Sequence, residues 1–313
     1  MPLAKSNELE IFYECFAGKT RAGKPVPEKF PARSRKENLI LIMGIGAQSV
    51  FWPDEFCGAL ARNDINVIRF DHRDIGRSTR FNHLGLPNIR RLMGRRALGL
   101  SVDAPYDLGD MADDVFGMMD ALKIPRAHIV GLSMGGMVGQ TMAIRRPERM
   151  KSLTSIMSTT GQRRHALGKP HALRALLAPP ARNVQQAIER TLRLFRIIGS
   201  PGYEFDDDLL RDAAARAYEH RGNPSGSARH MAAILRSGSR VPALRSVHIP
   251  TLVMHGLEDP LVLPSGGIAT ARAIPSARLK LFRGLGHDLP RGIWPEWIRL
   301  IRELVFEDAR LRR

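Results

Sequence analysis

The hexapeptide GLSMGG at residues 131–136 places one serine between glycines that stand two positions before and two positions after it. It follows an apolar run at residues 127–130, typical of a buried strand, and it precedes residues 137–144, which favour a helix. A serine hydroxyl becomes an effective nucleophile when a tight turn holds it exposed beside a base. Glycines at these two positions leave room where the strand and the helix approach each other. The hexapeptide therefore predicts a strand–turn–helix unit that presents Ser133 as a nucleophile, and an ordinary turn serine is the alternative.

The chain around this hexapeptide alternates between strand-like and helix-like segments. The run LILIM at residues 39–43 is apolar throughout, as expected of a strand covered by helices on both faces. The other strand-like segments are residues 8–16, 66–70, 153–157, 251–254 and 279–282, and helical patterns cover residues 53–62, 107–122 and 294–305. This alternation predicts an α/β fold with a mostly parallel central sheet.

The alternation stops between residues 161 and 245. This stretch has no strand-like run, and its helical patterns cover residues 184–198, 208–220 and 227–236. We therefore expect a core formed by residues 1–160 and 246–313, with residues 161–245 inserted as a helical cap.

The chain has 313 residues and a formal net charge of +17, most of it from arginine. Aromatic residues make up only 6% and no known docking motif is present, so we expect no nucleic-acid partner. The charge then indicates either a solvated basic surface or attraction of an anionic substrate or an acidic partner. No apolar window is long enough to span a membrane and no secretion signal precedes the fold, so we expect a cytoplasmic protein. Cys15 and Cys57 have neither metal-ligand nor disulfide spacing.

Two loops late in the chain complete a pattern that begins at Ser133. HGLEDP (255–260) follows the strand at 251–254, and GLGH (284–287) follows the strand at 279–282. The chain resembles the α/β-hydrolase superfamily, in which a serine, an acid and a histidine follow in this order. The run from residue 43 to residue 78, together with GLSMG, TLVMHGLEDP and GLGH, is similar to aclacinomycin methylesterase-like bacterial serine esterases. The similarity is weakest across the expected cap.

The resemblance implies the α/β-hydrolase fold, with helices flanking the sheet and the helical cap inserted after the sixth strand. Ser133 matches the nucleophile, Asp259 the acid and His287 the base. The amides of Ile45 and Met134 match the two oxyanion donors. An alternative makes Glu258 the acid and Asp259 a helix N-cap. The residue at the end of the preceding strand, His255, is interpreted as hydrogen-bonded and structural.

The activity expected from this resemblance is hydrolysis of a carboxylic ester of modest size through an acyl-enzyme, with neither a metal nor an organic cofactor. Phe51, Trp52, Leu261 and Leu263 are candidates for the acyl pocket, with core packing as the alternative. The partner is a small-molecule ester, for which an anionic group is a further hypothesis, and the sequence gives no indication of oligomeric state. Rival functions are C–C bond hydrolysis, a cofactor-free perhydrolase or haloperoxidase reaction, and a non-catalytic small-molecule receptor on the same fold.

Two further patterns resemble binding motifs. The charged run DHRD at residues 71–74 contains one histidine and lacks the spacing of a metal site, so we favour a structural ion-pair turn. Gly44 and Gly46 form only part of a phosphate-binding fingerprint, which argues against a nucleotide site.

Overall fold

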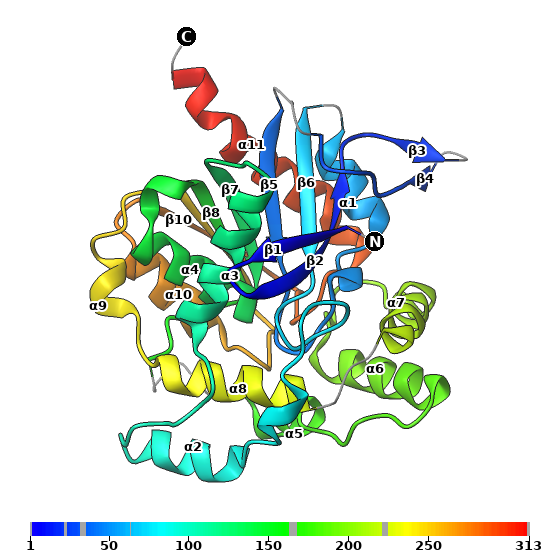
Figure 1. Cartoon of the computed structure of the whole chain (residues 1–313), viewed down its shortest axis with the longest axis vertical. Coiled ribbons are helices and arrows are strands. Elements are labelled where there is room, and N and C mark those ends of the chain that lie inside the picture. Colours follow the sequence, from blue (N-terminus) through cyan, green and yellow to red (C-terminus); the bar gives the residue numbers. More distant parts are fainter. Residues whose placement is uncertain are drawn as a thin grey trace.

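The protein is described by a computed structural model that covers residues 2–21, 24–31, 36–62, 64–162, 168–220 and 225–311, with side chains to residue 307. An eight-stranded sheet crosses the molecule (Figure 1), and its strands lie in the order β1-β2-β6-β5-β7-β8-β9-β10. The strands are β1 (Leu3–Ser6), β2 (Leu9–Phe16), β5 (Glu37–Ile42), β6 (Ile65–Phe70), β7 (Ala127–Leu132), β8 (Met150–Ile156), β9 (Thr251–Gly256) and β10 (Ala277–Phe282). β1 and β2 pair antiparallel with each other and β2 pairs antiparallel with β6, whereas the remaining pairs are parallel.

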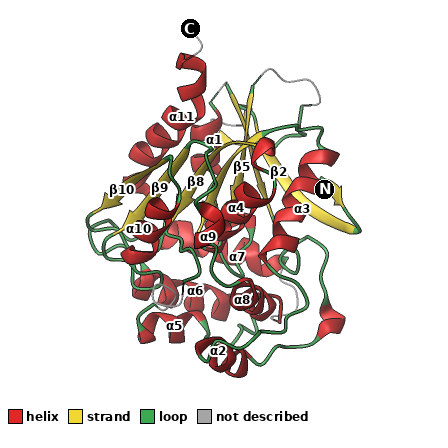
Figure 2. Ribbon diagram, turned by 90° about the vertical axis from the view of Figure 1, so that its left-hand side faces the viewer, coloured by secondary structure: helices red, strands yellow, loops and turns green. Residues whose placement is uncertain are grey.

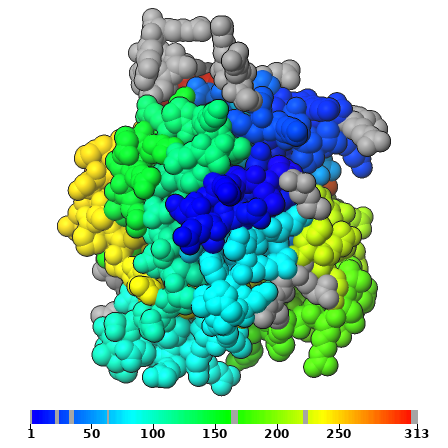
Figure 3. All heavy atoms as spheres, in the orientation of Figure 1, coloured from blue at the N-terminus to red at the C-terminus, as the bar shows by residue number. Residues whose placement is uncertain are grey.

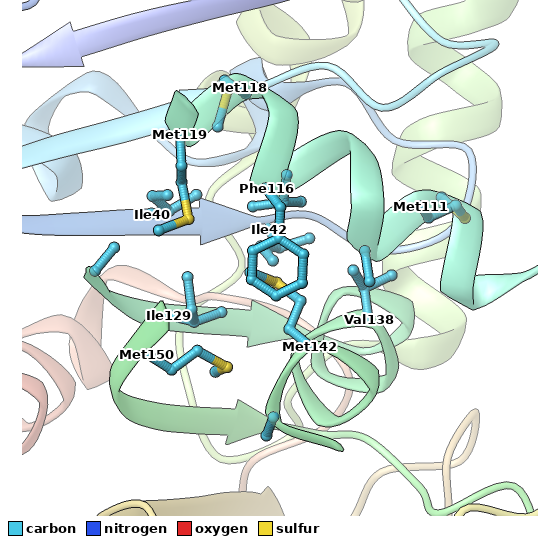
Figure 4. Packing of buried hydrophobic residues seen from close by; sticks show 14 of the residues in the cluster. Ile40, Ile42, Met111, Phe116, Met118, Met119, Ile129, Val138, Met142 and Met150 are labelled. Atoms are coloured by element: carbon cyan, nitrogen blue, oxygen red, sulfur yellow. The ribbon is translucent and has the colours of Figure 1, made fainter. Parts of the chain in front are cut away.

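Helices cover both faces of the sheet, which explains why its central strands are apolar throughout. One layer contains α1 (Asp54–Ala61) and α11 (Trp294–Leu311), whose buried side chains pack with those of β5, β6 and β9. The opposite layer contains α3 (Leu108–Ala121), α4 (Met134–Arg145) and α10 (Pro264–Ala273). Figure 4 shows methionines of α3 and α4 packed against Ile40, Ile42 and Ile129 of the sheet. The predicted fold class, with a mostly parallel sheet between helices, is confirmed.

Among the residues that the structure describes, five helices lie between β8 and β9. They are α5 (Pro170–Leu176), α6 (Val184–Ile198), α7 (Asp207–Glu219), α8 (Ser225–Ser237) and α9 (Val241–Leu244). β8 is the sixth strand of the large sheet along the chain, so the insertion stands at the predicted place. α5, α6 and α8 lie beyond one end of the strands in both views (Figures 1 and 2). The division into core and cap stays a prediction, and residues 163–167 and 221–224 of the expected cap lie outside the described residues.

A further helix, α2 (Ile89–Ala97), lies beside the inserted helices. It belongs to the segment between β6 and α3 rather than to the expected cap. α2 packs against α8 through Leu92 and Ala232. No sequence pattern predicted the helix at residues 89–97, and β1, α5, α9 and α10 were likewise not predicted. After β2, the short strands β3 (Thr20–Arg21) and β4 (Lys24–Pro25) pair antiparallel with each other. In the part of the chain described here, no helix has the length and apolar character needed to span a bilayer.

Candidate active site

The serine turn joins β7 to α4. Ser133 has a backbone φ of +56°, a conformation that non-glycine residues rarely adopt. A Cβ on Gly131 would come within 3.0 Å of the Gly135 carbonyl, and one on Gly135 would come equally close to the carbonyl of Ile42 in β5. The turn is held further by a hydrogen bond from the Ser133 amide to the Ile156 carbonyl, at 2.8 Å. These contacts give the physical reason for the glycines in GLSMGG.

The histidine and the acid of the predicted triad are in direct contact. His287 Nδ1 lies 2.6 Å from Asp259 Oδ2, and both side chains are almost fully buried. Asp259 Oδ1 accepts hydrogen bonds of 2.8 Å from the amides of Leu261 and Val262, which orients the carboxylate. Glu258, the alternative acid, is exposed.

Asp259 is ionised in this environment. Burial by itself would raise the pKa of its carboxyl group, but the electrostatic interaction with His287 and hydrogen bonds from His255 and His287 lower that pKa to about 2. His255 is fully buried, and its Nε2 lies 2.7 Å from the Val262 carbonyl and 3.4 Å from Asp259 Oδ2. His255 is therefore the hydrogen-bonded residue at a strand end that the sequence predicts.

The histidine loop is held by the segment that follows α6. The His287 amide donates to the Ile198 carbonyl at 2.6 Å, and the Gly286 amide donates to Ser200 Oγ at 2.9 Å. Ser200 Oγ in turn contacts Asp288, the residue after the histidine. A Cβ on Gly286 would come within 3.0 Å of the Gly199 carbonyl, so the two chain segments touch through their backbones. No sequence motif predicted this support of the histidine loop.

The loop after β5 lies beside the serine turn. A Cβ added to Gly44 would approach the Ser133 Cβ to 3.3 Å, and Ile45 and Ser133 line the same cavity. Met134 is the first residue of α4, and amides in the first turn of a helix have no partner within the helix. Of the two predicted oxyanion residues, Met134 thus directly follows Ser133 at the start of α4, and Ile45 lies in the wall of the cavity that Ser133 also lines.

His230 of α8 supports the loop after β5. Its Nδ1 accepts a hydrogen bond of 3.3 Å from the Gly46 amide, so its Nε2 carries the proton and donates to the Arg73 carbonyl at 2.9 Å. Burial lowers the pKa of His230 to about 4, which keeps the ring neutral. No sequence motif pointed to this residue, because its partners lie more than a hundred positions away in the chain.

Residues 37–290 match the model of the alpha/beta hydrolase fold family. The chain belongs to this family. It is 30% identical to rhodomycin D methylesterase DauP of Streptomyces sp. (strain C5) over 274 residues, which cover 82% of this chain and 86% of that protein. It is 29% identical to rhodomycin D methylesterase DnrP of Streptomyces peucetius, with the same coverage. The meta-cleavage product hydrolase CumD from Pseudomonas fluorescens IP01 superposes with a TM-score of 0.70 at 21% identity, over 99% of this chain and 98% of that chain.

These relationships confirm the predicted resemblance to methylesterase-like members of the family, and they support the prediction that the chain is a hydrolase enzyme. The likeness to CumD shows the shared fold.

The site of this α/β-hydrolase opens into a cavity of about 1160 Å³. Ser133 and His287 line its wall, the chain between β8 and β9 contributes the largest share of the other lining residues, and α2 adds Ile89, Arg90 and Met93. Two of the four pocket candidates, Phe51 and Leu261, also line it, and Phe51 stacks on Phe195 at a ring-centroid distance of 6.2 Å.

The other two pocket candidates do not line this cavity. Trp52 is fully buried in the layer of α1 and α11, stacked on Phe56 at 5.6 Å, and its carbonyl accepts a hydrogen bond from Arg69. Leu263 caps the start of α10. Core packing, the alternative considered for Trp52, therefore describes its position.

The charged run at residues 71–74 has a structural position in the α/β-hydrolase. Asp71 accepts hydrogen bonds from the amides of Ser49 and Arg77. Asp74 forms a buried ion pair of 2.7 Å with Arg229 of α8. Within the described ranges, no three His, Cys, Asp or Glu side chains gather closely enough to hold a metal ion.

Arg190 of α6 is a half-buried cation in the cavity wall. Its Nη2 donates to the carbonyls of Leu176 and Ala178, and its Nε is buried without a hydrogen-bond partner among the described residues. Burial lowers the pKa of its guanidinium, and among the described residues no carboxylate pairs with it. The cavity wall of the hydrolase therefore contains a positive charge that, among the described residues, only backbone carbonyls offset.

Proposed function

We propose that this α/β-hydrolase cleaves a carboxylic ester of a small molecule through an acyl-enzyme, with Ser133, His287 and Asp259 as its catalytic triad. The observation that carries the proposal is the 2.6 Å contact between His287 Nδ1 and Asp259 Oδ2, together with the position of Ser133 and His287 in the wall of one cavity. The contact leaves His287 Nε2 as the ring nitrogen available to the serine. The names of the methylesterase relatives support the same reaction class.

In this mechanism His287 Nε2 takes the proton of Ser133 Oγ as the oxygen attacks the ester carbonyl carbon. The amides of Ile45 and Met134 donate to the oxyanion that develops. His287 then protonates the leaving alcohol, and water attacks the acyl-enzyme by the same route to release the acid and free serine. Asp259 stays ionised throughout, which holds the imidazole tautomer and stabilises the imidazolium.

Residues 161–245 act as a cap over a core of residues 1–160 and 246–313, and their helices exclude water from the reacting groups. The cavity of about 1160 Å³ favours an ester larger than the modest size expected from the sequence. Its mostly apolar wall suits an apolar acyl or alcohol portion.

A chromogenic ester assay tests the reaction, with p-nitrophenyl acetate and p-nitrophenyl hexanoate as substrates. Ser133→Ala should lower kcat by about a thousandfold or more, since the nucleophile is lost. Ser276→Ala, which removes an exposed hydroxyl far from the cavity, is the matched control and should keep wild-type turnover. Wild-type turnover that survives Ser133→Ala would reject the proposed nucleophile. Stabilisation of the folded protein by these esters without any turnover would favour the alternative of a non-catalytic small-molecule receptor.

An anionic group on the substrate is the finer part of this proposal, and Arg190 supports it. A carboxylate at the far end of the ester would offset the guanidinium charge within the apolar wall. The test compares p-nitrophenyl hexanoate with the p-nitrophenyl half-ester of a dicarboxylic acid of similar length. Arg190→Gln should raise KM for the half-ester about tenfold and leave the neutral ester unchanged, whereas Arg193→Gln, an exposed arginine on the same helix, should change neither. Equal effects on both esters would exclude a charge-recognition role.

A further inference from the structure

The segment around α2 is rich in arginine and lacks acidic residues. Between Asp74 and Asp103 the sequence contains six arginines and no acidic residue. Four of these arginines, at positions 90, 91, 95 and 96, belong to α2. Arg95 donates to the Ser101 carbonyl and Arg96 to the Gly161 carbonyl, and no carboxylate of the described residues forms an ion pair with any of the four. The positive charge of this helix is therefore not neutralised within the described protein.

Exposed leucines surround the same helix. Leu84 and Leu86 precede α2 with 43% and 74% of their surface exposed, and Leu98 and Leu100 follow it with 77% and 50% exposed. Four of the nine large hydrophobic side chains that are exposed among the described residues thus lie within residues 84–100. Exposed apolar residues gathered beside unpaired basic residues mark an interaction surface more than scattered ones do.

The leucines do not belong to the apolar stripe that fixes α2 to the fold. That stripe consists of Ile89 and Leu92, which pack against Ala232 and Leu235 of α8. α2 forms the outermost edge of the molecule below the sheet in Figures 1 and 2, and the space-filling view in Figure 3 shows this cyan segment projecting there. Arg90, Arg91 and the four leucines are exposed on this segment, so they can meet a partner that approaches from this side.

The chemistry of the surface decides between possible partners. A second copy of the chain docked by the same face would bring two sets of unpaired arginines together, which is unfavourable. A nucleic acid would use the charge but gain nothing from the leucines, and the segment has no aromatic side chain exposed for base stacking. An anionic lipid surface suits both groups, since the arginines meet lipid phosphates while the leucines enter the interfacial region.

We propose that the α2 surface, made of residues 84–100, docks this hydrolase on an anionic lipid membrane. Leu86, Ile89, Arg90 and Met93 of this segment also line the cavity that contains Ser133. Docking by this face brings that side of the cavity to the lipid surface, where apolar esters concentrate. The inference does not depend on the proposed reaction, because membrane binding is measured without turnover.

Co-sedimentation of the full chain with vesicles tests this inference. Binding to phosphatidylglycerol vesicles should exceed binding to phosphatidylcholine vesicles at least tenfold and should weaken with added salt. Arg91→Gln and Arg95→Gln should each weaken binding to phosphatidylglycerol by about fivefold, as expected for one basic residue at an anionic surface. Leu98→Asp combined with Leu100→Asp should abolish it, because carboxylates would replace the inserted side chains.

Control variants separate this surface from the general basic charge. Arg245→Gln with Arg272→Gln removes two exposed arginines elsewhere, and Leu3→Asp changes an exposed leucine on β1; all should bind as wild type does. Circular dichroism and melting temperature should match wild type for every variant, which excludes misfolding as the cause of lost binding. Equal loss in the controls, equal binding to both lipids, or binding to single-stranded DNA but not to vesicles would overturn the proposal.

Discussion

The serine turn and the histidine loop of this α/β-hydrolase are both built on close backbone contacts, but different parts of the chain supply those contacts. At the serine turn, Gly135 lies against the Ile42 carbonyl of β5, within the central sheet. At the histidine loop, Gly286 lies against the Gly199 carbonyl, which belongs to the inserted helical segment. The sheet therefore fixes the serine turn by itself, whereas the histidine loop is held by the insertion as well as by the acid loop that follows β9.

This difference has a consequence for how the site is assembled. The sheet and α4 can place Ser133 without any of the inserted helices, because every contact described for the turn comes from β5, β7, β8 and their loops. His287 needs the hydrogen bond from its amide to the Ile198 carbonyl at the end of α6. Changes in the insertion should therefore alter catalysis through the histidine while leaving the serine turn intact.

The largest effect should come from breaking the serine turn. In Gly135→Ala the new Cβ would overlap the carbonyl of Ile42, and neither the strand nor the helix can withdraw without disturbing the sheet. We expect a loss of about 4 kcal/mol or more in the free energy of unfolding, measured by urea denaturation. Gly94→Ala in α2 is the control, since nothing lies within 4 Å of its Cβ, and its stability should rise slightly or stay unchanged. Similar stability of the two variants would contradict a serine turn held by the sheet.

The same contrast explains what could be predicted from the sequence. The serine turn was predictable because its strand, glycines and helix are consecutive in the chain. A short stretch of sequence therefore contains every residue that the turn needs. The support of the histidine loop was not, because Ser200 and Asp288 are separated by 88 positions and only the fold brings them together. His230 was missed for the same reason, since its partner Gly46 lies 184 positions away.

Missed secondary structure has local causes. α2 has only a short apolar stripe among four arginines, so its helical period is concealed by charge. β1 is four residues long and is too short to show alternation. Neighbouring positions in the sequence need not line the same cavity. Phe51 lies in the cavity wall, yet the side chain of the next residue, Trp52, lies in the core.

A low pH should destabilise the protein by weakening the contacts between the inserted helices and the core. Burial lowers the pKa of His230 to about 4 and that of its neighbour His72 to about 3, below the ordinary histidine value of about 6.5. Between these values the unfolded chain binds protons that the folded chain does not, so stability should fall as the pH drops from about 6.5 to about 4. His230 alone should cost ~3 kcal/mol over this range. Urea midpoints measured against pH should show this slope.

The control for the acid effect is His230→Gln, which removes one titrating group and should reduce the slope between pH 6.5 and 4. Asp259 acts in a lower window, because its depressed pKa of about 2 removes its stabilising contribution only as the pH falls below about 4. A wild-type midpoint that stays constant down to pH 4 would show that the buried histidines titrate normally.

A smaller effect on stability, but a clear one on activity, should follow from disturbing the histidine loop. In Gly286→Ala the added Cβ must displace the Gly199 carbonyl, and the segment after α6 can move outward more easily than a central strand can. We expect a loss of ~2 kcal/mol in unfolding free energy and roughly a hundredfold fall in kcat, since a displacement of about 1 Å in the base is costly. Urea denaturation measures the loss of stability, and kinetics with p-nitrophenyl hexanoate measure the fall in kcat. A stability loss as large as that of Gly135→Ala would remove the distinction between the two loops.

The smallest effect should come from Ser200→Ala, which tests the side-chain part of the same support. The Ser200 hydroxyl accepts a hydrogen bond from the Gly286 amide at 2.9 Å and contacts the carboxyl group of Asp288, whose pKa is raised by burial. Its removal leaves the backbone bond from His287 to Ile198 in place, so we expect ~1 kcal/mol of lost stability and about a tenfold fall in kcat with little change in KM. Ser200→Thr keeps the hydroxyl and should restore most of kcat, whereas Ser276→Ala should have no effect on it. If Ser200→Ala raised KM and left kcat unchanged, Ser200 would contact the substrate rather than position the histidine.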